Sequence, residues 1–172
     1  MTVSNRAAAR DHRTLNGASG KDFATSLLQL QRTVRTACMG CTGWEAQIVA
    51  GIHATLSFAA SHPEAAEALT TRADGDENHC GVPQDEVISY FARLLAERTP
   101  DMRLRVGSEE AVVSAIVILV RGHLLAGMTE KVRELAPEAI FLALMPYLGQ
   151  DAATRWAATP ARADHPLVGV SP

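Results

Sequence analysis

The stretch that decides the fold class is Ser108-Glu-Glu-Ala-Val-Val-Ser-Ala-Ile-Val-Ile-Leu-Val-Arg-Gly-His-Leu-Leu-Ala-Gly127. Its β-branched run suits a strand, but about 19 residues lie between the Ser108 cap and the Gly127 stop, which is the length of a helix. Glu109 and Glu110 stand in the first turn, where carboxylates stabilise the positive end of a helix. A helix that is apolar all round is buried all round, so we expect the core of the chain to cover one side of this helix and a second subunit to cover the other.

A second apolar block follows the first. Residues Ala139-Ile-Phe-Leu-Ala-Leu-Met145 carry no polar side chain, and they lie between Pro137 at a helix start and Gly149 at its end. We expect the helices over 108–127 and 137–149 of two copies to form a four-helix bundle across a two-fold axis. The interface residues predicted from this pairing are Val113, Val117, Ile118, Val120, Ile140, Phe141, Leu144 and Tyr147.

The rest of the chain shows helical spacing of apolar residues and no strand alternation. The fold class predicted is therefore all-α, an antiparallel helical bundle. The earlier helices are expected over 22–39, 44–60, 63–72 and 83–99, with a last helical stretch starting at Thr129. The expected domain plan is a disordered basic arm over 1–21, a helical domain over 22–150 and a loose proline-containing tail over 151–172.

Composition excludes several classes of protein. The formal net charge of −3 and the pI near 6.1 argue against nucleic acid as the main partner. No run approaches the ~18 apolar residues that a membrane span needs, and the N-terminus has no apolar signal segment. We therefore expect a cytoplasmic chain without a membrane partner, in which Cys38, Cys41 and Cys80 are reduced thiols.

Catalytic motifs are missing, and one metal-like motif is present. The chain has no G-x-S-x-G, P-loop or dinucleotide fingerprint, so we expect no enzyme and no cofactor. Cys38-Met-Gly-Cys41 is a C-x-x-C that would complete a Cys₃His set with His79-Cys80. The helix over 44–60 spans roughly 25 Å, and nothing requires the later loop to return. Ordinary thiols and no metal are therefore expected, while a redox or metal sensor remains the alternative.

Three segments together resemble a known family. They are Trp44-Glu-Ala-Gln-Ile-Val-Ala-Gly-Ile52, Phe58-Ala-Ala-Ser-His-Pro-Glu-Ala-Ala66 and Glu134-Leu-Ala-Pro-Glu-Ala-Ile-Phe-Leu-Ala-Leu-Met-Pro-Tyr-Leu-Gly149. From about Asp22 to Gly149 the chain resembles the C-terminal core of the tetracycline-repressor (TetR) family of bacterial transcriptional regulators. The resemblance implies dimerisation through the last two long helices and binding of a small, mostly apolar effector.

In that family an N-terminal helix-turn-helix headpiece reads DNA. Three helices need about 45 residues, and only 22 precede the region of resemblance, so DNA binding by this chain alone is not expected. The resemblance therefore predicts the core of a small-molecule-responsive regulator. Besides the thiol sensor, a structural interaction module without an effector remains a second alternative.

The effector site is expected between the helices that carry Phe23–Val34, Trp44–Phe58, Val87–Leu95 and the start of the Ser108 helix. Their apolar faces contain few large aromatic side chains, and mostly apolar walls with a few polar contacts are typical of ligand sites. The apolar residues expected to converge are Leu27, Leu30, Ile52, Leu56, Phe91 and Ile116. The polar contacts expected are His53, Tyr90 and Arg121.

Overall fold

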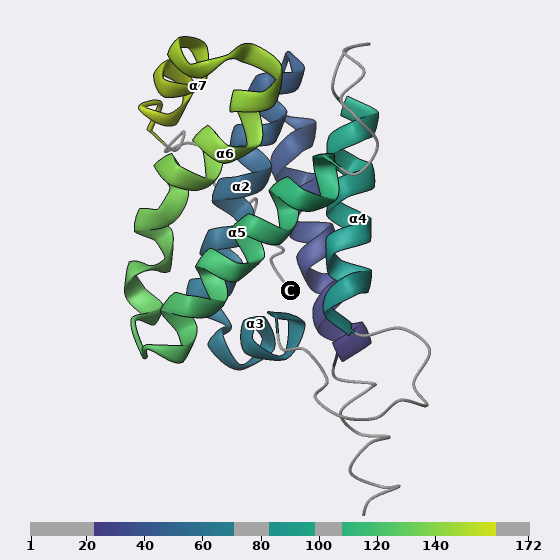
Figure 1. The fold of residues 1–172 in the computed structure, drawn as a ribbon. Coiled ribbons are helices and arrows are strands. Elements are labelled where there is room, and N and C mark those ends of the chain that lie inside the picture. The colour runs from purple at the N-terminus through teal and green to yellow at the C-terminus, as the bar shows by residue number, and fades with distance from the viewer. Residues whose placement is uncertain (1–22, 71–82, 99–107, 161–172) are drawn as a thin grey trace, which may run out of the picture.

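The computed structural model describes residues 23–70, 83–98 and 108–160, and all regular structure in these ranges is helical (Figure 1). The all-α prediction is therefore confirmed. The arm predicted over 1–21 and the loop with His79 and Cys80 lie outside the described residues. The elements are a first helix over 23–39, α2 (Trp44–Ser61), α3 (Pro63–Thr70), α4 (Pro83–Arg98), α5 (Ser108–Leu125), the 3₁₀ helix η1 (Thr129–Leu135), α6 (Ala136–Leu148) and α7 (Gln150–Ala157).

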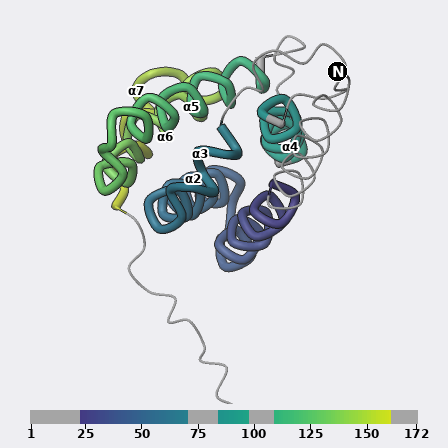
Figure 2. The backbone as a smooth tube through the Cα atoms, turned by 90° about the horizontal axis from the view of Figure 1, so that it is seen from below, coloured from purple at the N-terminus to yellow at the C-terminus, as the bar shows by residue number. Residues whose placement is uncertain are grey.

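Helix α5 lies between two groups of helices. It packs against α3 and α4 on one side and against η1 and α6 on the other. Figure 2 shows α6 and α7 beside α5 on one side of the molecule, with the first helix and α4 on the other side. The apolar stretch of α5 therefore contacts both groups of helices. None of the described helices combines the length and apolarity needed to cross a bilayer.

The larger part of the core is centred on α6. Ile140 and Leu144 have no exposed surface, and Val132 of η1 is equally buried. These side chains pack with Leu56 of α2 and Val120 of α5 into one continuous cluster. Close packing of this kind is what gives a protein interior its density, and here it joins α2, α5, η1 and α6.

The other part of the core lies between the first helix, α2, α3 and α4. Leu27, Leu30 and Val34 form a buried stripe at helical spacing along the first helix. They pack with Phe58 of α2 and Val87 of α4, among others. The inward face predicted from the spacing of these leucines is confirmed.

Glycines end the helices where the sequence predicts. Gly127 has φ 69°, its N–H donates to the carbonyl of Leu124, and the next N–H, of Met128, donates to the carbonyl of His123. This pair of hydrogen bonds around a left-handed glycine is a Schellman motif, which satisfies the last carbonyls of α5. Gly149, with φ 75°, separates α6 from α7.

One boundary predicted from sequence is wrong. Residues 150–157, most of which were assigned to a loose tail, form α7, and this helix packs along α6. Ala153 has no exposed surface and Trp156, three residues later on the same face, packs against the α6-centred cluster. The apolar contact of these two side chains keeps α7 packed on α6. The composition of this segment alone is too polar to predict a helix.

Candidate functional site

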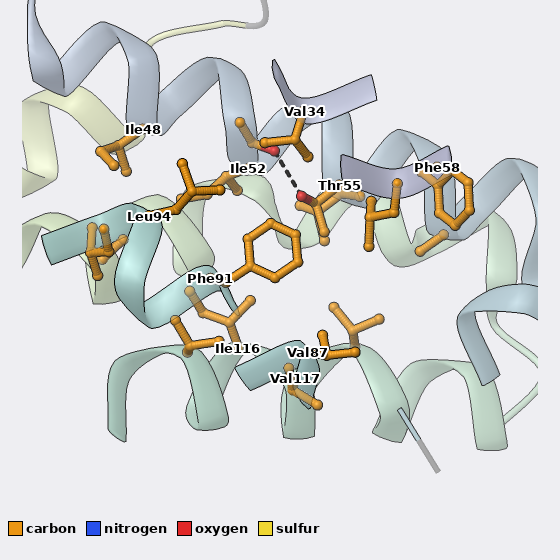
Figure 3. Close-up of a pocket in the computed structure, with 18 of the residues that line it drawn as sticks. Val34, Ile48, Ile52, Thr55, Phe58, Val87, Phe91, Leu94, Ile116 and Val117 are labelled. Carbon is orange, nitrogen blue, oxygen red and sulfur yellow. Dashed lines mark hydrogen bonds between the residues drawn. The ribbon is translucent and has the colours of Figure 1, made fainter. Parts of the chain in front are cut away.

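A cavity of about 140 Å³ lies between the first helix, α2, α3, α4 and α5, with one residue of α6 in its wall (Figure 3). Phe91 of α4 projects toward its middle, with Ile52 and Thr55 of α2 on one side and Ile116 and Val117 of α5 on the other. Its wall consists of Leu30, Val34, Cys38, Gln47, Ile48, Gly51, Ile52, Thr55, Leu56, Phe58, Ala59, Ala66, Leu69, Thr70, Val87, Phe91, Leu94, Leu95, Val112, Val113, Ile116, Val117, Val120 and Ala143.

Helical periodicity brings these side chains to one place. Within α5 the lining residues Val113, Ile116, Val117 and Val120 recur at spacings of three and four, so they share one face. The same holds for Val87, Phe91, Leu94 and Leu95 along α4. Many of the side chains that meet here are short, being valine, alanine, threonine or glycine, and they leave the space between the helices unfilled.

The polar residues of the wall are bonded within the chain. The Thr55 hydroxyl donates to the carbonyl of Gly51 at 2.8 Å, drawn as the dashed line in Figure 3, and the Thr70 hydroxyl donates to the carbonyl of Ala66 at 2.8 Å. The Cys38 thiol donates to the carbonyl of Gln47 at 3.3 Å. The Gln47 amide nitrogen donates in turn to the carbonyl of Cys41 at 3.2 Å.

Among the residues that the structure describes, no charged side chain lines the cavity. An ion placed there would lose its hydration without gaining a partner, which costs far more than a neutral molecule of the same size would lose. The cavity is therefore suited to an uncharged, apolar molecule. An apolar cavity of about 150 Å³ takes a molecule the size of benzene, so the space here suits a small aromatic or aliphatic compound.

Several residues predicted for an effector site do line this cavity. They are Leu30, Ile52, Leu56, Phe91 and Ile116. Leu27 is buried in the same part of the core but is not part of the wall. The helices named from the sequence all line the space, and α3 and α6 contribute to the wall in addition.

The polar contacts predicted for the site do not line it. His53 follows Ile52 and Tyr90 precedes Phe91, but a step of one residue turns the side chain about 100° around a helix. Tyr90 packs edge-on against Phe91, with ring centroids 5.2 Å apart. Arg121 is half-buried near the end of α5 and is also outside the wall.

His53 faces α7 instead. Burial lowers the pKa of its imidazole, and a hydrogen bond to the backbone of Thr159, just after α7, opposes that shift. The Nε2 atom is buried and has no partner among the described residues. His53 therefore belongs to the contact between α2 and the end of α7.

Sequence reasoning missed part of the wall. Val113 and Val117 were assigned to a dimer interface, whereas they line the cavity. Thr55 was not singled out, and Ile48 was placed on the same apolar face as Ile52 but not in the site, although the two stand at spacings of three and four from Ile52 on α2. Extending the periodicity of Ile52 in both directions would have found them. Cys38 was singled out for its chemistry and not as a cavity residue.

Most residues predicted for a dimer interface lie inside the chain. Ile140 and Leu144 have no exposed surface, so their side chains cannot reach a second copy. Tyr147 is also buried; it packs edge-on against Trp44 and its hydroxyl donates to the Glu109 carboxylate at 3.4 Å. Val113, Val117 and Val120 are equally buried.

The predicted interface residues that remain outside are Ile118, which is 64% exposed, and Phe141, which is half-buried. Together with other exposed or half-buried apolar residues of α5 and α6 they make up what we call the α5–α6 face. Its members are Ile118, Leu119, Leu125, Phe141, Leu142 and Met145. Leu119, Phe141 and Leu142 also line a shallow groove together with Pro137 and the carboxylates of Glu134 and Glu138.

Metal ligation has little support among the described residues, which contain no group of three or more His, Cys, Asp or Glu side chains able to hold an ion. Cys38 and Cys41 carry thiols. No family model, curated protein or solved structure matches this chain. What the cavity and the α5–α6 face do is therefore inferred from their own residues.

Proposed function

We propose that this chain is the effector-binding and homodimerising core of a small-molecule-responsive transcriptional regulator, similar to the TetR family. The observation that carries the proposal is the cavity of about 140 Å³ lined by residues of six helices. The resemblance of the segments around Trp44, Phe58 and Tyr147 also supports it, and these segments contribute Ile52, Phe58 and Ala143 to the cavity wall.

The effector of this proposal is a small, uncharged and apolar molecule. Walls of leucine, valine, isoleucine and phenylalanine supply contact area but no counter-ion. The hydroxyls of Thr55 and Thr70 already donate to carbonyls of their own helices. Affinity then comes from apolar burial, at roughly 25 cal/mol for each Å² removed from water.

The partner of this proposal is a second copy, docked through the α5–α6 face. Ile118 and Leu125 are 64% and 63% exposed, and Met145 is 41% exposed. Burying such side chains against their own symmetry mates stabilises a two-fold dimer. Helix α5 would then contact the effector through Val113, Val117 and Val120 and the partner through its opposite side, so one rigid helix would couple the two events.

The proposal is tested by ligand-induced thermal shifts with neutral alkylbenzenes, from toluene to butylbenzene. A ligand at 100 times its Kd stabilises by about 2.7 kcal/mol, which raises the Tm of a chain this size by several degrees. Ile52→Trp fills the cavity and should abolish the shift. The control is Leu28→Trp, which makes a similar change on the outer side of the first helix, where Leu28 is 55% exposed.

Two results would contradict effector binding at this site. One is the absence of a shift with every compound in the series. The other is a shift that survives in Ile52→Trp as strongly as in Leu28→Trp. Either result would favour the interaction module without an effector.

A further inference from the structure

The corner between the first helix and α2 contains both described cysteines. Cys38 stands at the end of the first helix and Cys41 follows Gly40, before Gly43 introduces α2 with φ 88°. The corner closes one end of the cavity, because Cys38 is part of the cavity wall. The proposed function makes no use of either sulfur atom.

The backbone of this corner holds the two cysteines close together. The N–H of Cys41 donates to the carbonyl of Cys38 at 3.1 Å. A hydrogen bond between residues three apart closes a turn whose end α-carbons lie within about 7 Å of each other. A disulfide requires an α-carbon separation of about 4.4–6.8 Å, so the turn brings the pair into the range that a disulfide spans.

The two thiols differ in exposure. Cys38 is 3% exposed, and its sulfur faces α2, where a Cβ built on Gly51 would lie 3.5 Å from it. Cys41 is half-buried, beside the exposed Met39 and Gly40. A reagent from solvent therefore meets Cys41 first, and Cys38 is placed three residues away to react second.

The bonds that hold the thiols in place are weak. The Cys38 thiol donates to the carbonyl of Gln47 at 3.3 Å, and the Cys41 thiol donates to the carbonyl of Ala37 at 3.5 Å. A thiol is a poor hydrogen-bond donor, so turning either side chain toward the other costs little. The Gln47 amide bond to the carbonyl of Cys41 does not involve sulfur and is kept when the thiols move.

We infer that Cys38 and Cys41 form a redox modification site at the cavity end, which small-molecule disulfides such as oxidised glutathione convert to a Cys38–Cys41 disulfide. The Cys41 thiolate attacks one sulfur of the reagent and releases one thiolate, leaving a mixed disulfide. The Cys38 thiolate then attacks the Cys41 sulfur and releases the second thiolate. The chain loses two electrons and two protons, and the reagent becomes two thiols.

Oxidation at this site changes the cavity. Forming the bond withdraws the Cys38 sulfur from its place beside Gly51 in the cavity wall and breaks its hydrogen bond to the carbonyl of Gln47. The wall loses a handful of dispersion contacts, so a bound apolar molecule is held roughly two- to fivefold more weakly. This consequence rests on the proposed function, whereas the disulfide itself does not.

The test uses full-length protein with Cys80→Ser, equilibrated in glutathione buffers of increasing oxidised fraction. Trypsin leaves Cys38 and Cys41 in one peptide, from Thr36 to Arg72, so the disulfide appears as a loss of two hydrogen atoms in that peptide. We expect this species to replace the dithiol, with little mixed disulfide. In Cys38→Ser a glutathione adduct should accumulate on Cys41, and in Cys41→Ser an adduct on Cys38 should form much more slowly.

Mixed disulfides alone in the Cys80→Ser protein, or a peptide that stays reduced in fully oxidised glutathione, would overturn the site. A second arm compares toluene binding to the reduced and the oxidised Cys80→Ser protein. Equal affinity in the two forms would overturn the effect on the cavity and leave the disulfide standing. Absence of binding to the reduced protein would count against the proposed function, while the peptide measurement would still decide the redox site.

Discussion

The two parts of the core are equally apolar but differ in how completely they are filled. Around α6, Ile140 and Leu144 have no exposed surface and belong to a continuous cluster. Between the first helix, α2, α4 and α5, residues of the same chemistry enclose about 140 Å³ of space. Burial of apolar surface therefore stabilises both regions, while the sizes of the facing side chains decide which region has space for a ligand.

The largest effect expected from this comparison is on stability. Leu144→Ala should destabilise by about 3–5 kcal/mol, because it opens a void in a filled region. Leu94→Ala removes the same atoms from a half-buried residue that already borders empty space, so roughly 1–2 kcal/mol is expected. Urea unfolding measures both, and equal losses would mean that the two regions are packed alike.

The next effect concerns the outer side of α5. Ile118→Asp places a charge on the α5–α6 face and should convert the proposed dimer to monomers that remain folded, because an unpaired charge in an interface is costly. Leu28→Asp, on the exposed side of the first helix, is the matched control and should remain dimeric. Sedimentation velocity at micromolar concentration measures the change. If the wild-type chain is a monomer under these conditions, the proposed dimer is wrong.

A third pair of variants adds volume to the two regions from a single helix. Ala139 and Ala143 are one turn apart on α6, but only Ala143 lines the cavity. Ala139→Val overfills a packed site and should destabilise by about 1–3 kcal/mol. Ala143→Val projects toward free space and should be within about 1 kcal/mol of wild type. The urea midpoints of the two variants measure this difference in stability. Equal midpoints would mean that the cavity is closed in solution.

The smallest effect expected is a pH dependence at the contact between α2 and α7. Burial lowers the pKa of His53 below its ordinary 6.5, so the unfolded chain takes up a proton more readily than the folded chain. The stability that this histidine contributes is therefore complete above about pH 6.5 and is lost as the pH falls below that value. His53→Gln should flatten the decline in unfolding free energy between about pH 7.5 and 5.5. An unchanged slope would contradict this assignment.

Much of the fold follows from local signals in the sequence. Gly127 and Gly149 end α5 and α6 as predicted, because the chain needs a positive φ at these two positions. The stripe of Leu27, Leu30 and Val34 identifies the inner face of the first helix, because the other faces carry Gln29, Arg32 and Arg35 and only scattered apolar residues. In both cases the physical reason lies within a few residues.

The orientation of α5 is not available from the sequence. Val113, Val117 and Val120 face inward while Ile118 faces outward, yet all four residues belong to one run that carries no charge and a single hydroxyl. A helix that is apolar all round has no polar face to indicate its direction. The predicted interface therefore mixed cavity wall, core and surface, and tertiary packing alone separates them.

The polar side of the candidate site was mispredicted for a related reason. His53 and Tyr90 adjoin cavity residues in sequence but not in space, since neighbours along a helix point in different directions. The short helix α7 depends on the contact of Ala153 and Trp156 with α6. The sequence around these two residues does not predict that contact. Long-range packing decides these features.

The most direct test of the central claim is a methyl NMR titration with toluene on protein labelled at its isoleucines. The chain has six, at positions 48, 52, 88, 116, 118 and 140. The account predicts saturable shifts of Ile48, Ile52 and Ile116, which line the cavity, while Ile140 in the filled core and Ile118 on the outer face stay in place. Shifts centred on Ile118 or Ile140, or no saturable shift at any of the six methyl groups, would contradict it.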